Sequence, residues 1–373
     1  MSDDDARGAR IVVFGATGYT GRLVAEALVD RGERPVLAGR DPSRLAAVAD
    51  PLGGLPTVVA DASRSESVAA ALEPGDVLVS TVGPFTRLGG PAVRAAADLG
   101  ATYLDSTGEG AFIREVFERH DARARSNGAR LLPALGYDWA PGNLAGALAL
   151  REAGDAATAL DVGYFLSGND TLAMSAGTSA TTVTSLADRS YTFRDGALRT
   201  ERAAARVLSF EVDGRQRPAL SVGATEQLSL PRLHDGVRDV NVYLGWFGGR
   251  TRALQAFGLG VGALTALPPG RSLLRALTAR APGGRSGAGP DEATRAETGS
   301  VVVAVARAAD GVPLAEVRLE GANPYTFTAR FLAWAAEQAR AGRIAGSGAM
   351  GPAEAFDLDV LERGMAEAGL ARV

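Results

Sequence analysis

The sequence of 373 residues contains no cysteine, no lysine and only two histidines, His120 and His234. Without cysteine, disulfides, thiolate metal sites and thiol nucleophiles are excluded. All 39 basic residues are arginine, which is a poor general acid or base because it does not release its proton. A Schiff base, a P-loop lysine and a Tyr-x-x-x-Lys pair are therefore excluded as well. Two histidines cannot build a His-rich metal site, and we predict no metal.

The sequence also lacks an excess of one charge and a long hydrophobic run. Its net charge of −4 gives no indication of a nucleic-acid partner. Residues 1–10 are acidic and polar, unlike a signal peptide. The apolar stretch 253–267 is short and interrupted by glycine, so it predicts a buried or lid helix, or the wall of an apolar substrate channel, and not a membrane span. We therefore expect a cytoplasmic protein.

The most informative stretch that is present lies at the start. An apolar segment at 11–14 leads into a glycine-rich turn and then an amphipathic segment, the strand–turn–helix order of dinucleotide-binding folds. Small residues in such a turn let backbone N–H groups approach a pyrophosphate at the helix N-terminus. The residues that we expect around the pyrophosphate are Gly15, Thr17, Gly18, Tyr19, Thr20 and Gly21. An ordinary tight turn without a ligand is the alternative.

The end of the next predicted strand indicates which dinucleotide binds. Arg40 stands where an NAD-specific fold carries Asp or Glu for the ribose 2′-hydroxyl, and Arg44 follows one helical turn later. A guanidinium can pair with a 2′-phosphate in bidentate fashion, whereas a carboxylate would repel it. We therefore predict NADP(H). Asp61, after the third strand, is expected at the level of the adenine or as a helix cap, and the two roles are compatible.

Alternating strands and helices in the first third predict a doubly wound parallel sheet of the Rossmann type, an α/β fold. The strands are expected at 11–14, 35–39, 57–60, 76–80, 101–105 and 130–134, and the helices at 20–31, 42–50, 65–72, 89–99 and 110–127.

Beyond about residue 150, longer alternating segments predict a second α+β domain with a mostly antiparallel sheet. Its strands are expected at 158–166, 205–213, 218–228, 238–246, 300–308 and 312–320, and its helices at 175–187, 251–266, 271–279 and 325–341, with a mobile loop at 281–290. We divide the chain into residues 1–148, 149–343 and 344–373, the last returning to the first domain.

Ligands bind beyond the carboxyl ends of strands in such sheets, so three strand ends should converge on one crevice. The loop after the fourth strand should border the ribose and nicotinamide through Thr81, Val82, Gly83, Pro84 and Phe85. The next two strands end near the candidate catalytic residues Tyr137, Asp138, Asp105 and Glu109.

Tyr137 and Asp138 are the first candidates for proton donation, because a carboxyl in a partly dry cleft can have a raised pKa. Asp105 and Asp138 could instead only cap loops, and water could supply the proton. Phe85 and Trp139, with 253–267, could form an apolar wall of the site, which would suit a bulky hydrophobic substrate.

Several motifs resemble the saccharopine dehydrogenase-like oxidoreductases, most closely the branch of trans-acting enoyl reductases. The motifs are Gly15–Gly21 with Arg40, Val82–Phe85, Tyr103–Glu109 and Gly136–Asp138 with Pro141, with fainter echoes at Gly177-Thr178, Gly321–Tyr325 and Gly351–Phe356. The resemblance implies a Rossmann domain with an inserted α+β domain, a C-terminal helix that returns to the Rossmann domain, NADPH as cofactor and a homodimer through the second domain.

These observations favour an NADPH-dependent reductase acting on a C=C, C=N or C=O bond of a small hydrophobic substrate, such as a lipid or polyketide. Two alternatives remain open. One is a protein that senses NADP(H) without chemistry, which the missing lysine and scarce histidine would suit. The other is a dehydrogenase of an amino-acid derivative, of the saccharopine type.

Overall fold

The computed structural model describes residues 8–168, 189–252, 255 and 289–373, which form two compact units. Unit 1 consists of Met1–Gly108, Phe112–Ala140 and Pro324–Leu370, and unit 2 of Glu109–Ala111, Pro141–Asn323 and Ala371–Val373. The predicted helices 175–187 and 271–279, most of 251–266 and of the apolar stretch 253–267, most of the loop 281–290 and the pair Gly177-Thr178 lie outside the described residues.

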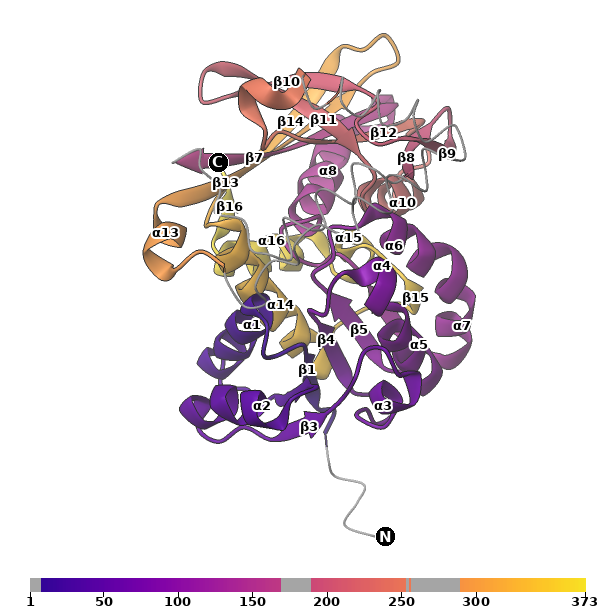
Figure 1. The fold of residues 1–373 in the computed structure, drawn as a ribbon. Coiled ribbons are helices and arrows are strands. Elements are labelled where there is room, and N and C mark those ends of the chain that lie inside the picture. The colour runs from indigo at the N-terminus through magenta and orange to yellow at the C-terminus, as the bar shows by residue number, and fades with distance from the viewer. Residues whose placement is uncertain (1–7, 169–188, 253–254, 256–288) are drawn as a thin grey trace, which may run out of the picture. The chain divides into compact units, whose positions relative to one another are not determined.

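Unit 1 is built on a seven-stranded sheet in the order β15-β6-β5-β4-β1-β2-β3, in which every pair is parallel (Figure 1). Its strands are β1 (Ile11–Phe14), β2 (Val36–Gly39), β3 (Thr57–Val59), β4 (Val77–Ser80), β5 (Thr102–Asp105), β6 (Arg130–Leu132) and β15 (Gly348–Ala349). The predicted doubly wound parallel sheet is confirmed.

Burial explains why these short segments are strands. Every residue of β1, β4 and β5 is buried, as expected for parallel strands covered by helices on both faces. In α1 the buried residues Gly21, Val24, Ala25 and Leu28 follow the spacing of one helical face, and this face turns α1 toward the sheet.

The helices of unit 1 form two groups in Figure 1, α1 with α14, and α3 with α5 and α7. Their bounds are α1 (Tyr19–Asp30), α2 (Pro42–Ala49), η1 (Asp50–Leu52), α3 (Ser65–Ala69), α4 (Phe85–Leu88), α5 (Gly90–Leu99), α6 (Gly110–Glu115), η2 (Val116–His120), α7 (Asp121–Asn127), α14 (Pro324–Arg340), α15 (Pro352–Ala355) and α16 (Leu358–Glu367). The single helix predicted at 110–127 is thus divided, with one wider π-helical turn at Val116–His120.

Helix α14 belongs to unit 1, although the sequence analysis placed 149–343 in a second domain. Most of its 17 residues are buried, and it packs against α1, β4 and β5. Helical periodicity predicts that one face of α14 is buried. It does not specify which of the two sheets that face packs against, and therefore does not assign α14 to a unit.

Unit 2 contains a nine-stranded sheet, mostly antiparallel as predicted, in which β7 and β12 form a parallel pair. Its strands are β7 (Ala159–Gly168), β8 (Arg189–Arg194), β9 (Ala197–Arg202), β10 (Val207–Val212), β11 (Arg215–Val222), β12 (Asp239–Leu244), β13 (Thr298–Arg307), β14 (Pro313–Gly321) and β16 (Leu370–Arg372). The helices are α8 (Ala140–Ala153), η3 (Gly154–Ala156), α10 (Glu226–Ser229), η4 (Leu230–Arg232), η5 (Gly248–Arg250) and α13 (Glu292–Ala296).

Three features of unit 2 differ from the sequence prediction. Strands β8 and β9 and helix α8 were not predicted, and the strand expected at 218–228 ends at Val222. One face of the sheet carries a core in which the rings of Phe165, Phe210 and Tyr243 meet edge to face. Helix α8 packs against the other face. Its residue Gly146 lies against Leu160, and any larger side chain at this position would collide with Leu160.

Within the described ranges, no helix is long and apolar enough to cross a membrane. The same residues contain no group of three or more acidic or imidazole side chains placed to hold a metal ion.

Candidate functional site

The glycine-rich turn joins β1 to α1 at the carboxyl edge of the parallel sheet. Gly15 has a φ of +89°, and its N–H donates to the Ala38 carbonyl at 2.9 Å, so the chain turns sharply after β1. A Cβ on Gly21 would collide with the Gly15 carbonyl, which is why α1 can begin this close to β1. No side chain caps the first turn of α1, and an uncapped helix N-terminus suits an anion.

The loop after β4 lies beside this turn. The strand order reverses between β1 and β4, and a ligand of a doubly wound sheet binds at such a point. Thr81 donates from Oγ1 to the Phe14 carbonyl at 3.1 Å, and a Cβ on Gly15 would lie 2.8 Å from Thr81 Oγ1 and from Val82 Cγ2. The structure therefore brings two sequence-predicted groups, the glycine turn and the start of the 81–85 loop, to one place.

The two aromatic residues predicted to contribute to an apolar wall are both buried. The Phe85 ring is 5% exposed and packs 5.6 Å from the Phe112 ring, while Trp139 is 3% exposed. Gly83 is exposed and Pro84 half-buried. Phe85 thus packs its ring against Phe112 within unit 1, and the exposed residue of the 81–85 loop is Gly83.

At the ends of β2 and β3, the predicted arginines are exposed. Neither Arg40 nor Arg44 forms an ion pair with any described residue. The Asp61 carboxylate accepts hydrogen bonds from the Ser63 N–H at 2.9 Å and the Ser63 hydroxyl at 2.8 Å. These bonds, and the nearby positive charge of Arg40, hold the pKa of Asp61 below its usual value. Asp61 caps its own loop, since the helix that follows begins only at Ser65.

The loop after β6 carries Asp138, whose environment is unusual for a carboxyl group. The residue is half-buried, yet its Oδ1 is shielded from solvent and accepts no hydrogen bond from any described residue. Its Oδ2 packs against Gly108, where a Cβ would lie only 2.9 Å away. Burial raises the pKa of Asp138 to about 7, because the charged form is poorly solvated there.

Asp105, at the end of β5, fastens the two loops that meet at Asp138. Its Oδ1 accepts the N–H groups of Thr107 and Ala134, both at 2.8 Å. Thr107 precedes Gly108, and Ala134, with a φ of +58°, opens the loop that leads to Asp138. The geometry therefore gives Asp105 a positioning role.

Tyr137 contacts two residues of α14. Its N–H donates to Thr328 Oγ1 at 2.9 Å, and its ring meets that of Phe327 edge to face at 6.5 Å. The side chain is 2% exposed. In this structure Tyr137 is thus more deeply buried than Asp138.

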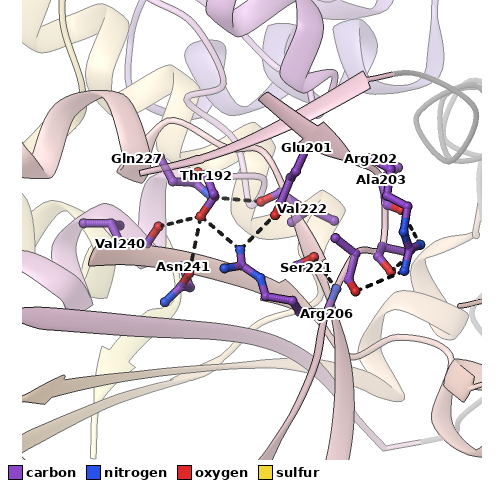
Figure 2. Close-up of polar contacts among 12 residues, drawn as sticks. Thr192, Glu201, Arg202, Ala203, Arg206, Ser221, Val222, Gln227, Val240 and Asn241 are labelled. Atoms are coloured by element: carbon purple, nitrogen blue, oxygen red, sulfur yellow. Dashed lines mark hydrogen bonds and ion pairs between the residues drawn. The ribbon is translucent and has the colours of Figure 1, made fainter. Parts of the chain in front are cut away.

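Glu109 falls in unit 2 and is buried, so the four candidate catalytic residues are not all members of one unit. Unit 2 has a polar network of its own, which Figure 2 shows around Arg206. Arg206 Nη2 donates to Thr192 Oγ1 at 2.9 Å and pairs with Glu201 at 3.1 Å, while Thr192 Oγ1 lies 3.3 Å from Asn241 Oδ1 (Figure 2). These contacts fasten the β8–β9 hairpin to β12.

Comparisons with known proteins complete this picture. Residues 11–132 match the family described as "Saccharopine dehydrogenase NADP binding domain". Residues 11–132 contain the glycine turn, Arg40, Arg44, Asp61 and the 81–85 loop, and the prediction of NADP(H) as the cofactor is confirmed.

Curated relatives share the same region. The trans-acting enoyl reductase of Mycobacterium ulcerans (strain Agy99) is 43% identical over 140 residues, which are 36% of this chain and 34% of that protein. The trans-acting enoyl reductase of Mycobacterium leprae (strain TN) is 42% identical over 146 residues, 38% of this chain and 35% of that protein. The predicted resemblance is confirmed, although the alignments span only about a third of each relative.

A solved structure resembles the whole chain. Apo histidine-tagged saccharopine dehydrogenase (L-Glu forming) from Saccharomyces cerevisiae has a TM-score of 0.63 at 14% identity, over 98% of this chain and 99% of that one. At this identity, the likeness shows the fold alone.

The side chains of the NADP-binding domain fit the cofactor that its family implies. The uncapped start of α1 and the small residues of the turn suit a pyrophosphate, and the unpaired guanidinium groups of Arg40 and Arg44 suit a 2′-phosphate. Sequence reasoning missed the supports of the Asp138 loop, Gly108 and Thr328. Gly108 lies within a quoted motif, but no local pattern connects Thr328 with residue 137, because their contact spans 191 positions.

Proposed function

We propose that this chain is an NADPH-dependent reductase that delivers a hydride to a C=C, C=N or C=O bond of a small hydrophobic substrate. The observation that carries the proposal is the Asp138 carboxyl, which has a shielded Oδ1 and a pKa of about 7, in the NADP-binding unit. The names of the mycobacterial relatives support an oxidoreductase and make an enoyl C=C bond our first choice of target.

Reduction of a double bond consumes one hydride and one proton. NADPH, when bound, supplies the hydride. A carboxyl that titrates near neutral pH can hold and release the proton, and its efficiency is greatest when its pKa lies close to the working pH. Asp138 meets this requirement, and the absence of lysine and the scarcity of histidine leave few other side chains that could.

The other predicted catalytic residues take different roles in this proposal. Asp105 positions the loops on either side of Asp138 through its bonds to Thr107 and Ala134. Tyr137 is the second candidate for proton donation, limited by its burial. Glu109 is assigned no step, since it belongs to unit 2.

The test is loss of absorbance of the reduced nicotinamide with a panel of enones, enoyl thioesters, imines and ketones. We expect at least one enoyl compound to be reduced, and Asp138→Asn to lower its turnover about 10²- to 10⁴-fold while NADPH binding is retained. Tyr137→Phe should lower turnover less.

Two results would contradict the proposal. If no compound of the panel is reduced while NADPH binds tightly, a sensing role replaces the reductase. If Asp138→Asn reduces substrates as fast as the unaltered protein while Tyr137→Phe does not, the proton comes from Tyr137 instead.

A further inference from the structure

A four-residue pattern, Asp-x-Ser-Arg, occurs twice in unit 1, at residues 41–44 and 61–64. Strands β2 and β3 pair in parallel, with Gly39 opposite Val59. Asp41 and Asp61, which begin the two tetrapeptides, each follow this residue pair by two positions. Neighbouring strands thus present the same four residues at corresponding positions of the carboxyl edge, where the nucleotide of a doubly wound fold binds.

The two tetrapeptides repeat the same hydrogen bonds. Asp41 Oδ1 accepts the Ser43 N–H at 2.9 Å and the Ser43 hydroxyl at 2.6 Å. Asp61 Oδ1 accepts the Ser63 N–H at 2.9 Å and the Ser63 hydroxyl at 2.8 Å. Each serine therefore donates twice to Oδ1 of the aspartate that precedes it, and Asp41 Oδ1 also accepts the Arg44 N–H at 3.2 Å. These bonds lower the pKa of both aspartates.

The arginines that end the two tetrapeptides are left unpaired. Arg44 and Arg64 are exposed, and neither forms an ion pair with a described residue; the same holds for Arg40. Arg40 and Arg64 nevertheless lie close enough to Asp61 for their charges to lower its pKa. Arg40 and Arg64 thus lie near Asp61, and Arg44 lies near Asp41, but none of the three guanidinium groups pairs with either carboxylate.

We propose that Arg64 joins Arg40 and Arg44 in binding the 2′-phosphate of NADP(H). Ser63 is a positioning residue in this arrangement, because its N–H and hydroxyl keep the Asp61 carboxylate from pairing with Arg40. Ser43 does the same for Asp41. The serines let the chain carry acidic residues beside a phosphate site without neutralising its arginines, and a guanidinium fork that is not already paired binds a phosphate most strongly.

This inference deepens the proposed function but rests only on its NADP-binding part, so its test is a binding measurement that involves no substrate. The dissociation constants of NADPH and NADH are measured by calorimetry on the full chain. The readout is their ratio, because NADH lacks the 2′-phosphate and reports on everything else in the site. Arg34→Ala, at the amino end of β2, and Ser126→Ala, on α7, are the matched controls.

Arg64→Ala should weaken NADPH binding about three- to tenfold and change NADH binding less than about twofold. Ser63→Ala should also lower the preference for NADPH, since it frees Asp61 to approach Arg40. The double variant Ser63→Ala/Asp61→Asn should restore the preference, and Ser63→Thr, which keeps the hydroxyl, should retain it.

An unchanged ratio in Arg64→Ala would overturn the role of Arg64. Equal weakening of both nucleotides in Ser63→Ala, or failure of Asp61→Asn to restore the ratio, would reduce Ser63 to a structural residue. If Ser63→Ala does not fold, Ser63→Thr and the single variant Asp61→Asn test the role of Ser63 instead. Neither of these variants should lower the preference for NADPH over NADH. Tight, selective NADPH binding without any reductase activity would contradict the reaction proposed above and leave this inference intact.

Discussion

Two sequestered aspartates, Asp161 of unit 2 and Asp138 of unit 1, have opposite environments. In unit 2, Asp161 on β7 accepts a hydrogen bond from Asn241 Nδ2 at 3.0 Å and pairs with Arg307 Nε at 2.8 Å. In unit 1, Asp138 has a shielded Oδ1 that accepts no hydrogen bond from a described residue, and its pKa rises to about 7. A paired carboxylate stabilises the sheet that contains it, whereas an unpaired one remains able to exchange a proton at neutral pH.

A few arginines of the two units show a similar contrast. Arg206 and Arg307 of unit 2 are tied to Glu201 and Asp161, and Arg202 donates to the carbonyls of residues 203–205 (Figure 2). Arg40 and Arg44 of unit 1 have no such partner among the described residues. Unit 1, which contains the NADP-binding domain, thus has an unpaired carboxyl group in Asp138 and unpaired guanidinium groups in Arg40 and Arg44. A bound cofactor or substrate could pair with them.

The largest expected effect is on the pH dependence of turnover. If Asp138 donates the proton, turnover should fall as the pH rises above about 7, approaching about tenfold per pH unit, because the protonated fraction falls at that rate. Asp138→Asn should abolish this alkaline limb of the pH profile, the fall in turnover above about pH 7, together with most of the activity. Asp161→Asn should keep the alkaline limb. A limb that persists in Asp138→Asn would mean that another group titrates.

The next prediction concerns stability and gives the two aspartates opposite signs. Burial raises the pKa of Asp138 from 3.8 to about 7, so between these values the unfolded chain releases a proton that the folded one retains. The free energy of unfolding therefore decreases across this window and levels off above about pH 7. Asp138→Asn should remove the loss and be more stable at pH 8 by on the order of 4 kcal/mol.

Asp161→Asn should instead be less stable, by about 2 kcal/mol at pH 7, since it leaves Arg307 without its partner. Urea unfolding of both variants at pH 5 and pH 8 measures the comparison. Two variants with the same sign at pH 8 would show that Asp138 has an unrecognised partner.

A smaller effect is expected from Arg40→Ala. Loss of one exposed phosphate contact should weaken NADPH binding about tenfold and leave NADH binding nearly unchanged, because NADH has no 2′-phosphate. Arg206→Ala, which removes a paired arginine of unit 2, should alter stability and not the ratio of the two dissociation constants. Equal loss of both nucleotides in Arg40→Ala would contradict the assignment.

The sequence predicted unit 1 better than unit 2 for a physical reason. Parallel strands covered on both faces are continuous apolar runs, so β1, β4 and β5 could be placed to within a residue. Strands β8 and β9 carry many charged residues, and β9 is largely exposed, so no apolar alternation marks them. Their turn, Asp195-Gly196, has φ values of +53° and +75°, and the turn Asp213-Gly214 between β10 and β11 has similar values of +55° and +69°.

The candidate site divides along the same line. The glycine turn and Arg40 could be predicted because their chemistry depends on residues adjacent in sequence. The sequence could suggest a raised pKa for Asp138 but could not predict the environment that causes it. That environment depends on Gly108 and on a loop that Asp105 holds by a hydrogen bond. Helix α8 escaped prediction because its first ten or more residues are buried all round and show no amphipathic period.

The smallest expected effect tests whether the unpaired carboxyl depends on the helix beneath it. Thr328→Val keeps the volume of the side chain but removes the hydroxyl that accepts the Tyr137 N–H, which should cost about 1 kcal/mol of stability. It should also loosen the loop that carries Asp138, admit water to the carboxyl and lower its pKa, so the limb of the pH profile should move to lower pH. Thr328→Ser, which keeps the acceptor, should leave the limb in place. A shift of the same size in both variants would show that packing, and not this hydrogen bond, keeps Asp138 protonated, and the contrast with Asp161 would then rest on burial alone.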